Sequence, residues 1–258
     1  MKVGIYADEQ AVGAAAAQYF MNVMKAADRQ VVGVATGSTP LPLYERLRQA
    51  HAAGSFSLTG AHAFALDEYI GIPQDHPEAY RNVLRAELVG DDKTGLSEEG
   101  LHTPDGRAED PQVAAADYDR AIRESGGIVL QILGIGANGH IGFNEPGGSL
   151  VSRTHVDALT ERTRKDNARF FDNDISQVPT MCVTQGLGTI MEAKHLLLIA
   201  TGAAKADAVA AMVEGGVSAV CPASILQMHP SVVVFVDEAA ASKLQYADLY
   251  RNRWEVLS

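Results

Sequence analysis

The chain has 258 residues, of which 47% are apolar and 21% charged, a composition typical of a globular enzyme with one large or two small domains. Its net charge of −11 argues against a nucleic-acid partner. No apolar run approaches ~18 residues and the apolar part of the first ten residues is short, so we expect neither a membrane span nor a signal peptide.

Strand and helix patterns alternate through the first 90 residues. Apolar runs predict strands at 2–7, 31–35 and 61–66, followed by helical patterns at 9–27, 41–53 and 78–88. Asp8 stands where the N-cap of the first helix is expected.

The turn after the second strand, TGSTP at 36–40, leads directly into a helix. Free backbone N–H groups and hydroxyls at a helix N-terminus form a cradle for an anion. The turn lacks the Gly-Lys-Ser/Thr ending of a nucleotide-binding P-loop, which favours a monophosphate over a nucleoside triphosphate. A plain capped turn remains the alternative.

Two adjacent carboxylates, Asp67 and Glu68, follow the third strand. Neighbouring residues of a strand point to opposite sides, so at most one of the two can face a site. Taken alone, the pair is equally consistent with a helix cap or with two solvated side chains.

The middle of the chain contains its most unusual stretch. Residues 91–110 read as a polar surface loop, and Asp110 and Pro111 begin a helix to about residue 125. The stretch 128–149 then starts as a continuous apolar run, typical of a strand buried on both faces, and breaks into glycines and polar residues. Such a strand end is where an α/β sheet usually carries its chemistry.

The same stretch satisfies the dinucleotide-binding pattern G-x-G-x-x-G at 134–139. That pattern has to open a helix, whose free N–H groups hold the pyrophosphate. The residues that follow, HIGFNEPGG, are too rich in glycine and proline for a helix. We therefore expect no nicotinamide cofactor, and the spacing of the eight histidines suggests no metal site either.

Residues 153–174 are rich in interspersed charges and read as a solvated helix pair. The functional alternative is a mobile lid over a pocket, around residues 153–180.

The last third returns to alternating strands and helices. It predicts strands at 195–200 and 231–236, and helices after Lys205, at 222–228 and at 238–250. Lys205 stands at a helix start, where the helix dipole disfavours a cation, so a ligand role is the better explanation for it. Six or seven apolar strands alternating with helices predict a single α/β domain, 1–258, with a doubly wound, mainly parallel, Rossmann-like sheet and helices on both faces.

The two cysteines, Cys182 and Cys221, lie in apolar surroundings without C-x-x-C spacing. We interpret them as buried free thiols in a reducing, cytoplasmic compartment, with a disulfide between them as the minor alternative.

Five separated motifs occur in an order that is familiar from one family. They are ATGSTP at 35–40, LDEY at 66–69, GANGHIGFNEP at 136–146, NARFFDN at 167–173 and TGAAK at 201–205. Over nearly its whole length the chain resembles the glucosamine-6-phosphate deaminases, whose superfamily also holds sugar-phosphate isomerases and 6-phosphogluconolactonases. The lactonases differ at the third motif, which lacks Asn-Glu-Pro.

The resemblance implies a reaction without cofactor or metal. Glucosamine 6-phosphate would be opened, isomerised and deaminated to fructose 6-phosphate and ammonia, a step in amino sugar metabolism and N-acetylglucosamine catabolism. Asp67 would move the C2 proton, and His140, oriented by Glu145, would open the ring. The phosphate would be held by the following residues: Gly37, Ser38, Thr39, Arg169 and Lys205.

Two positions depart from the pattern of many members. Asn138 stands where Asp is common, and because an amide carries no charge it would orient His140 by hydrogen bonding only. Allosterically activated members carry a basic cluster after the Asn-Glu-Pro segment, where this chain has Gly148, His155 and Asp157. We therefore expect no activation by N-acetylglucosamine 6-phosphate, and a monomer or small homo-oligomer in preference to an allosteric hexamer.

Three other functions stay open at this point. Galactosamine-6-phosphate deamination or isomerisation differs only in the stereochemistry of the sugar. A lactonase-like hydrolase shares the superfamily, as do sugar-phosphate-sensing regulators, but the regulators carry an N-terminal DNA-binding helix-turn-helix, whereas this chain starts directly in a strand.

Overall fold

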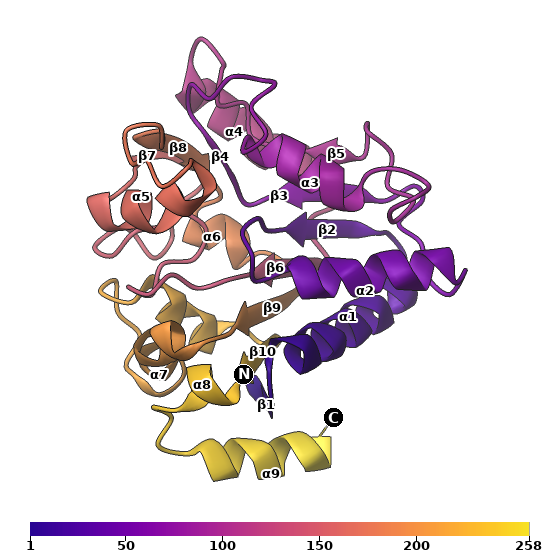
Figure 1. Ribbon diagram of the computed structural model, residues 1–258, viewed down its shortest axis with the longest axis vertical. Coiled ribbons are helices and arrows are strands. Elements are labelled where there is room, and N and C mark those ends of the chain that lie inside the picture. The colour runs from indigo at the N-terminus through magenta and orange to yellow at the C-terminus, as the bar shows by residue number, and fades with distance from the viewer. Residues whose placement is uncertain (258) are drawn as a thin grey trace.

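Continuous apolar runs form the central strands of the protein. The computed structural model describes residues 1–257 and places seven parallel strands in the order β1-β10-β9-β6-β2-β3-β5 (Figure 1). These strands are β1 (Lys2–Tyr6), β2 (Val31–Val34), β3 (His62–Ala65), β5 (Leu101–His102), β6 (Leu130–Leu133), β9 (His195–Ala200) and β10 (Val232–Asp237). Every residue of β2, β6 and β10 is buried, as expected for parallel strands covered on both faces.

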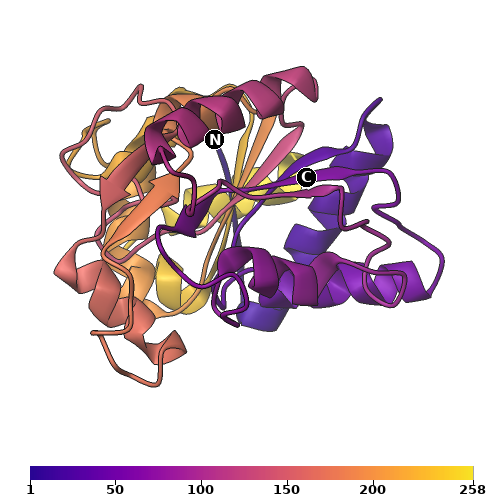
Figure 2. The ribbon, with the colours of Figure 1, turned by 90° about the horizontal axis from the view of Figure 1, so that it is seen from above.

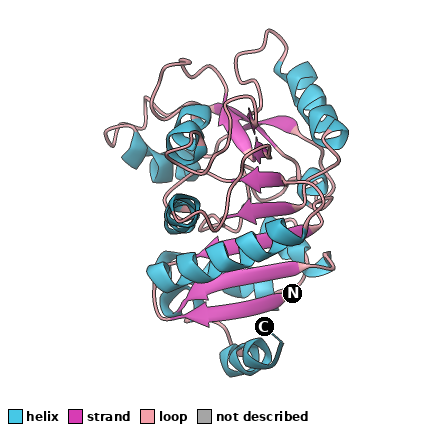
Figure 3. Cartoon of the chain, turned by 90° about the vertical axis from the view of Figure 1, so that its right-hand side faces the viewer, coloured by secondary structure: helices cyan, strands magenta, loops and turns pink. Residues whose placement is uncertain are grey.

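Helices lie on both faces of this sheet (Figure 3). The longer ones are α1 (Glu9–Ala26), α2 (Leu41–Ala52), α3 (Tyr80–Leu88), α4 (Pro111–Glu124), α5 (Glu161–Asn167), α7 (Ala206–Glu214) and α9 (Ala247–Leu257). Asp8 and Asp110 accept hydrogen bonds from the first backbone N–H groups of α1 and α4, as predicted. The architecture confirms the doubly wound, mainly parallel sheet. Within residues 1–257, no helix has the length and apolar character to cross a bilayer.

A second, three-stranded antiparallel sheet was not predicted. It consists of β4 (Asp67–Tyr69), β8 (Met181–Thr184) and β7 (His155–Ala158), in that order. The expected solvated helix pair at 153–174 is therefore wrong: this segment holds one strand, α5 and a 3₁₀ turn at Ala168–Phe170. In Figure 2 this salmon-coloured segment lies on the left of the molecule, away from the indigo and violet helices α1 and α2.

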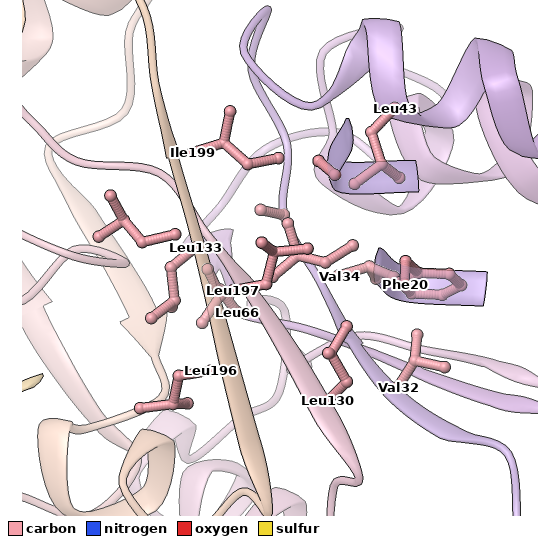
Figure 4. Packing of buried hydrophobic residues seen from close by; sticks show 14 of the residues in the cluster. Phe20, Val32, Val34, Leu43, Leu66, Leu130, Leu133, Leu196, Leu197 and Ile199 are labelled. Carbon is pink, nitrogen blue, oxygen red and sulfur yellow. The ribbon is translucent and has the colours of Figure 1, made fainter. Parts of the chain in front are cut away.

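Two apolar clusters hold the two sheets. The larger one fills the space between the seven-stranded sheet and its helices, and Figure 4 shows part of it around Phe20, Val34 and Leu197. The smaller one lies under the antiparallel sheet and consists of Tyr69, Ile72, Ala79, Phe143, Leu159, Ala168, Phe171, Val178 and Cys182. Residues 159–182 therefore pack on an apolar core that is separate from the core of the seven-stranded sheet.

The C-terminal region differs from expectation in detail. The helix predicted at 238–250 is interrupted between α8 (Glu238–Ala241) and α9. In the interruption, the Glu214 carboxylate accepts the backbone N–H groups of Gln245 and Tyr246 at 2.9 and 3.0 Å, which holds the chain out of helical conformation. The segment Pro222–Met228 is a 3₁₀ helix.

Both cysteines are free, as predicted, so the disulfide alternative is wrong. Cys182 is buried, whereas Cys221 is only half-buried.

The chain changes direction across the sheet between β2 and β6. The two strands are neighbours, with Val32 paired to Leu130 and Gly33 to Gln131. After β2 the chain continues through α2 to β3 on one side, and β6 is flanked on the other side by β9. Two adjacent parallel strands whose connections diverge leave a crevice at their carboxyl ends, where α/β proteins bind ligands.

Candidate active site

A cavity of about 350 Å³ opens at this crevice. Its walls come from the ends of several parallel strands and from the segment that carries α5. The turn after β2 (Thr36–Thr39), the loop after β6 (Gly134–Gly136), Asp67 after β3 and Lys205 after β9 all line it. A cavity of this size suits a small-molecule ligand.

Asp67 is the buried carboxylate of the cavity. It begins β4, pairs with Thr184 of β8 and is 7% exposed. Burial, together with the neighbouring Glu68 charge, raises the pKa of Asp67 to about 8. The side chain can therefore exchange a proton near neutral pH, which an ordinary aspartate cannot.

Glu68 points to the other side of β4, as the alternation of a strand requires. Its carboxylate accepts the backbone N–H groups of Tyr69, Tyr80 and Arg81, each at 2.9 Å. Two of these groups belong to the first turn of α3. Both predictions for the acidic pair are therefore correct, each for one residue: Asp67 faces the cavity, and Glu68 caps a helix.

His140 projects into the cavity from the loop after β6. Its Nδ1 lies 3.7 Å from Oε2 of Glu145, close enough for an ion pair when the ring is protonated. A Cβ on Gly136 would lie 2.2 Å from the ring, so the imidazole rests directly on the glycine backbone. This close approach explains a glycine at 136, independently of any dinucleotide.

Asn138 links the histidine to its carboxylate. Its Nδ2 donates to Glu145 Oε2 at 2.7 Å, and its Oδ1 accepts from the His140 backbone N–H at 3.2 Å. No α-helix follows this loop, since the next element after β6 is β7. The glycine-rich loop therefore does not open a helix, as its sequence predicted.

Glu145 stays ionised although it is buried. Burial disfavours its charge, but the nearby His140 imidazole and the hydrogen bonds from Thr163 and Asn138 outweigh that penalty and lower the pKa of Glu145 to about 2. Its other oxygen, Oε1, accepts the hydroxyl of Thr160 at 3.0 Å and that of Thr163. Both threonines belong to the segment around α5.

The opposite end of the cavity is built for an anion. Gly37 has a φ of +88°, and no atom lies within 4 Å of a Cβ built there, so the turn leaves open space at the N-terminus of α2. Leu41 donates its backbone N–H to Ser38 O at 3.2 Å, which fixes the turn. Because Leu41 uses its N–H and Pro42 has none, an anion here would be bound by the backbone N–H groups of the turn itself, Gly37 to Thr39.

Two cations face this turn. Arg169 Nη2 lies 3.5 Å from Ser38 Oγ, and its guanidinium stacks 4.6 Å from the centroid of the Phe170 ring. Burial lowers the pKa of Lys205; the charges of Arg169 and Arg162 act in the same direction, and Asp166 opposes them. A phosphate between these groups would relieve the repulsion among the cations.

The predicted site residues therefore come together in one place. Asp67, His140 and all five expected phosphate ligands line the cavity, while Asn138 and Glu145 stand behind His140. Among residues 1–257, no three His, Cys, Asp or Glu side chains are grouped as metal ligands would be.

Several residues of the site were missed by sequence reasoning. Asn167 of α5 donates to the Tyr69 hydroxyl at 2.9 Å, and Tyr80 donates to the same oxygen at 3.1 Å. Thr160 is the N-cap of α5, accepting the Thr163 N–H at 3.2 Å. A threonine before ERT is a recognisable cap signal, but the surrounding charges concealed it.

Comparison with known proteins gives a consistent result. Residues 7–235 match the family model described as glucosamine-6-phosphate isomerases/6-phosphogluconolactonase. The glucosamine-6-phosphate deaminase of Streptomyces avermitilis is 53% identical over 254 residues, covering 98% of this chain and 97% of its own. That of Cutibacterium acnes is 54% identical over 251 residues, covering 97% and 95%.

Solved structures show the same relationship. A monomeric glucosamine-6-phosphate deaminase superposes with a TM-score of 0.90 at 37% identity, over 94% of this chain and 100% of its own. The 6-phosphogluconolactonase of Trypanosoma cruzi superposes with a TM-score of 0.76 at 20% identity, over 95% and 97%, and shares the fold.

The raised pKa of Asp67 predicts a pH-dependent gain in stability on its removal. Because the folded-state pKa, about 8, lies above the ordinary value of 3.8, the carboxylate costs the folded state stability progressively from pH 4 to pH 8. Asp67→Asn should therefore raise the thermal midpoint by roughly 5 °C or more at pH 8.5 and by clearly less at pH 5.

The control for this experiment is Glu68→Gln, which disturbs three backbone hydrogen bonds and should lower the midpoint at both pH values. An Asp67→Asn protein with no gain at pH 8.5 would contradict the assignment of a costly buried charge.

Proposed function

The chain belongs to the glucosamine-6-phosphate isomerase/6-phosphogluconolactonase family, and we propose that it is a glucosamine-6-phosphate deaminase. The reaction consumes D-glucosamine 6-phosphate and water and yields D-fructose 6-phosphate and ammonia. The relatives at 53% identity over nearly the full chain carry this name, whereas the lactonases share the fold at 20% identity. Within amino sugar metabolism, we propose N-acetylglucosamine catabolism as its setting.

One observation carries the proposal. A proton-exchanging carboxylate, an imidazole with a carboxylate partner and a cationic anion cradle line a single cavity. An aldose phosphate needs these three functions: an anchor at C6, an acid/base group at the ring oxygen and a base at C2.

The first chemical step assigned to the site is ring opening by His140. The imidazole removes the proton of the C1 hydroxyl and returns a proton to the ring oxygen as the C1–O5 bond breaks. Glu145 stays ionised and stabilises the imidazolium that forms in between. Asn138 fixes the Glu145 carboxylate and the His140 backbone, which is an orienting role that needs no charge.

Asp67 then carries the isomerisation. Its carboxylate takes the C2 proton while the carbonyl oxygen at C1 takes a proton from the substrate's ammonium group, which gives an enolamine, and a proton is then delivered to C1. The resulting C2 imine adds water and loses ammonia, which leaves the C2 ketone. The substrate's own ammonium group, brought next to Asp67, lowers the pKa of the carboxyl and so favours the ionised form that acts as base.

The phosphate end anchors the substrate away from the reacting carbons. Lys205 supplies a point charge, Arg169 a fork of donors and the Gly37–Ser38–Thr39 turn its backbone N–H groups. The chain as a whole is negatively charged and repels an anionic substrate. The positive charges of Lys205 and Arg169 offset that repulsion at the phosphate end of the cavity.

We also propose that residues 153–180 act as a mobile lid. They contribute Thr163, Asp166, Asn167, Arg169 and Phe170 to the cavity wall. From residue 159 onward the segment packs on the smaller apolar cluster, so this part can shift without disturbing the main core. A lid of this kind would exclude water while the imine forms.

Ammonia release from glucosamine 6-phosphate and from galactosamine 6-phosphate, measured side by side, tests the function. We expect kcat/KM to favour the glucosamine substrate. Equal or better turnover of the galactosamine epimer, or hydrolysis of 6-phosphogluconolactone without deamination, would overturn the proposal.

Separate substitutions should divide binding from chemistry. Lys205→Ala or Arg169→Ala removes part of the anchor and should mainly raise KM. Asp67→Asn removes the base and should lower kcat by ~10²-fold or more. Steady-state kinetics distinguish the two effects, and an Asp67→Asn enzyme with near-native kcat would exclude Asp67 as the base.

The pH dependence of the native enzyme should report Asp67. As pH falls below about 8, the free enzyme protonates this carboxyl, so kcat/KM should decline on the acidic side of that value. In kcat the same limb should move to lower pH, because the bound ammonium favours the carboxylate. Superimposable limbs near pH 4 in both parameters would show that Asp67 has an ordinary pKa.

Activation by N-acetylglucosamine 6-phosphate should be absent. Asp157 Oδ2 lies 3.6 Å from His155 Nε2 on β7, which places a carboxylate where an effector phosphate would need a cation. Initial rates with and without the effector should agree, and light scattering should give a monomer or small oligomer. A clear rate increase would contradict this expectation.

A further inference from the structure

The two oxygens of Glu145 serve different parts of the molecule. Oε2 faces the loop after β6, with Asn138 Nδ2 at 2.7 Å and His140 Nδ1 at 3.7 Å. Oε1 faces the segment around α5, where it accepts the hydroxyls of Thr160 and Thr163. One carboxylate therefore connects the acid/base histidine to the proposed lid.

The donors on the Oε1 side are themselves organised by the helix. Thr160 is the N-cap of α5, and its Oγ1 lies 3.0 Å from Thr163 Oγ1 and 3.2 Å from the Thr163 backbone nitrogen. The Thr163 side chain is 3% exposed and lies between the cap and the carboxylate. Its hydroxyl can donate to Glu145 only while the first turn of α5 is formed and seated.

This arrangement is more than a helix cap. A cap needs Thr160 to accept a backbone N–H, which it does, but capping does not require Thr163 to donate to a residue 18 positions away. The donation places a neutral O–H dipole against a buried charge, which keeps Glu145 ionised and fixes its rotamer.

We propose that Thr163, seated by Thr160, is a positioning residue that makes the orientation of Glu145, and so of His140, depend on the first turn of α5 being in place. When that turn moves away with the lid, Oε1 loses both hydroxyl donors, and the Asn138 hydrogen bond to Oε2 alone holds the carboxylate, so its orientation toward His140 is less well fixed. The ring-opening acid/base group is then assembled only over a covered substrate. This inference rests on the proposed deaminase function and deepens it.

The test compares three variants of lid threonines. Thr163→Val removes the donor with little change in volume, Thr163→Ser retains the donor, and Thr180→Val makes the same change at an exposed threonine of the same segment. We expect Thr163→Val to lower kcat ~10-fold or more with KM within about twofold of native. Thr163→Ser should recover most of kcat, and Thr180→Val should match the native enzyme.

The alternatives give different results. Because Thr163 also lines the cavity, a direct contact with substrate would appear mainly as a raised KM. A role in folding alone would appear as a lowered thermal midpoint with a matching loss of kcat in Thr163→Ser. Either pattern would overturn the proposal.

A double-mutant cycle with Glu145→Gln identifies the partner. If Thr163 acts through the Glu145 charge, most of the Thr163→Val penalty should vanish in the Glu145→Gln background. An undiminished penalty would show that Thr163 acts by another route.

A readout that needs no turnover separates this proposal from the deaminase assignment. By ¹³C NMR, the Glu145 carboxyl should titrate at higher pH in Thr163→Val than its native value of about 2, because a donor to the charged form is lost. An unchanged titration would refute the Thr163 contact. If Thr163→Val shows this shift but the native protein releases no ammonia, the deaminase function alone is refuted.

Discussion

The divergence of the chain after β2 and β6 is the constraint on which the site depends. Neighbouring parallel strands whose connections run to opposite sides leave a crevice at their carboxyl ends. The two small-residue loops, 36–39 and 134–136, keep that crevice open because larger side chains would fill it. The other functional groups are brought to this edge from strand ends and the proposed lid.

Two buried carboxylates in one site have their pKa values pushed in opposite directions. Asp67 is desolvated beside another carboxylate, so its pKa rises to about 8, while hydrogen bonds hold Glu145 at about 2. The first can exchange a proton at neutral pH and the second can only hold a charge. Such a separation allows two carboxylates of one cavity to take the different roles proposed for them, Asp67 as the base and Glu145 as the orienting group.

The features that could be predicted from the sequence are those that depend on neighbouring residues along the chain. Buried strands, the caps Asp8 and Asp110, and the opposite orientation of Asp67 and Glu68 follow from spacing and residue type. Strand β7 was missed because HVDA has only four residues, is partly exposed and stands among charged residues, so its short alternation gives no clear strand signal. The Glu214 contacts that interrupt the last helix, and the Thr163–Glu145 contact, join distant residues and appear only after folding.

We propose that one sugar phosphate spans this crevice, with its phosphate at the β2 turn and its C1–C2 end between Asp67 and His140. A crystal structure with the reduced, open-chain form of glucosamine 6-phosphate tests it most directly. We predict phosphate oxygens within hydrogen-bonding distance of Lys205 Nζ and the Ser38–Thr39 backbone, and C2 against the Asp67 carboxylate. A ligand bound in the reverse orientation, or outside this cavity, would contradict the account.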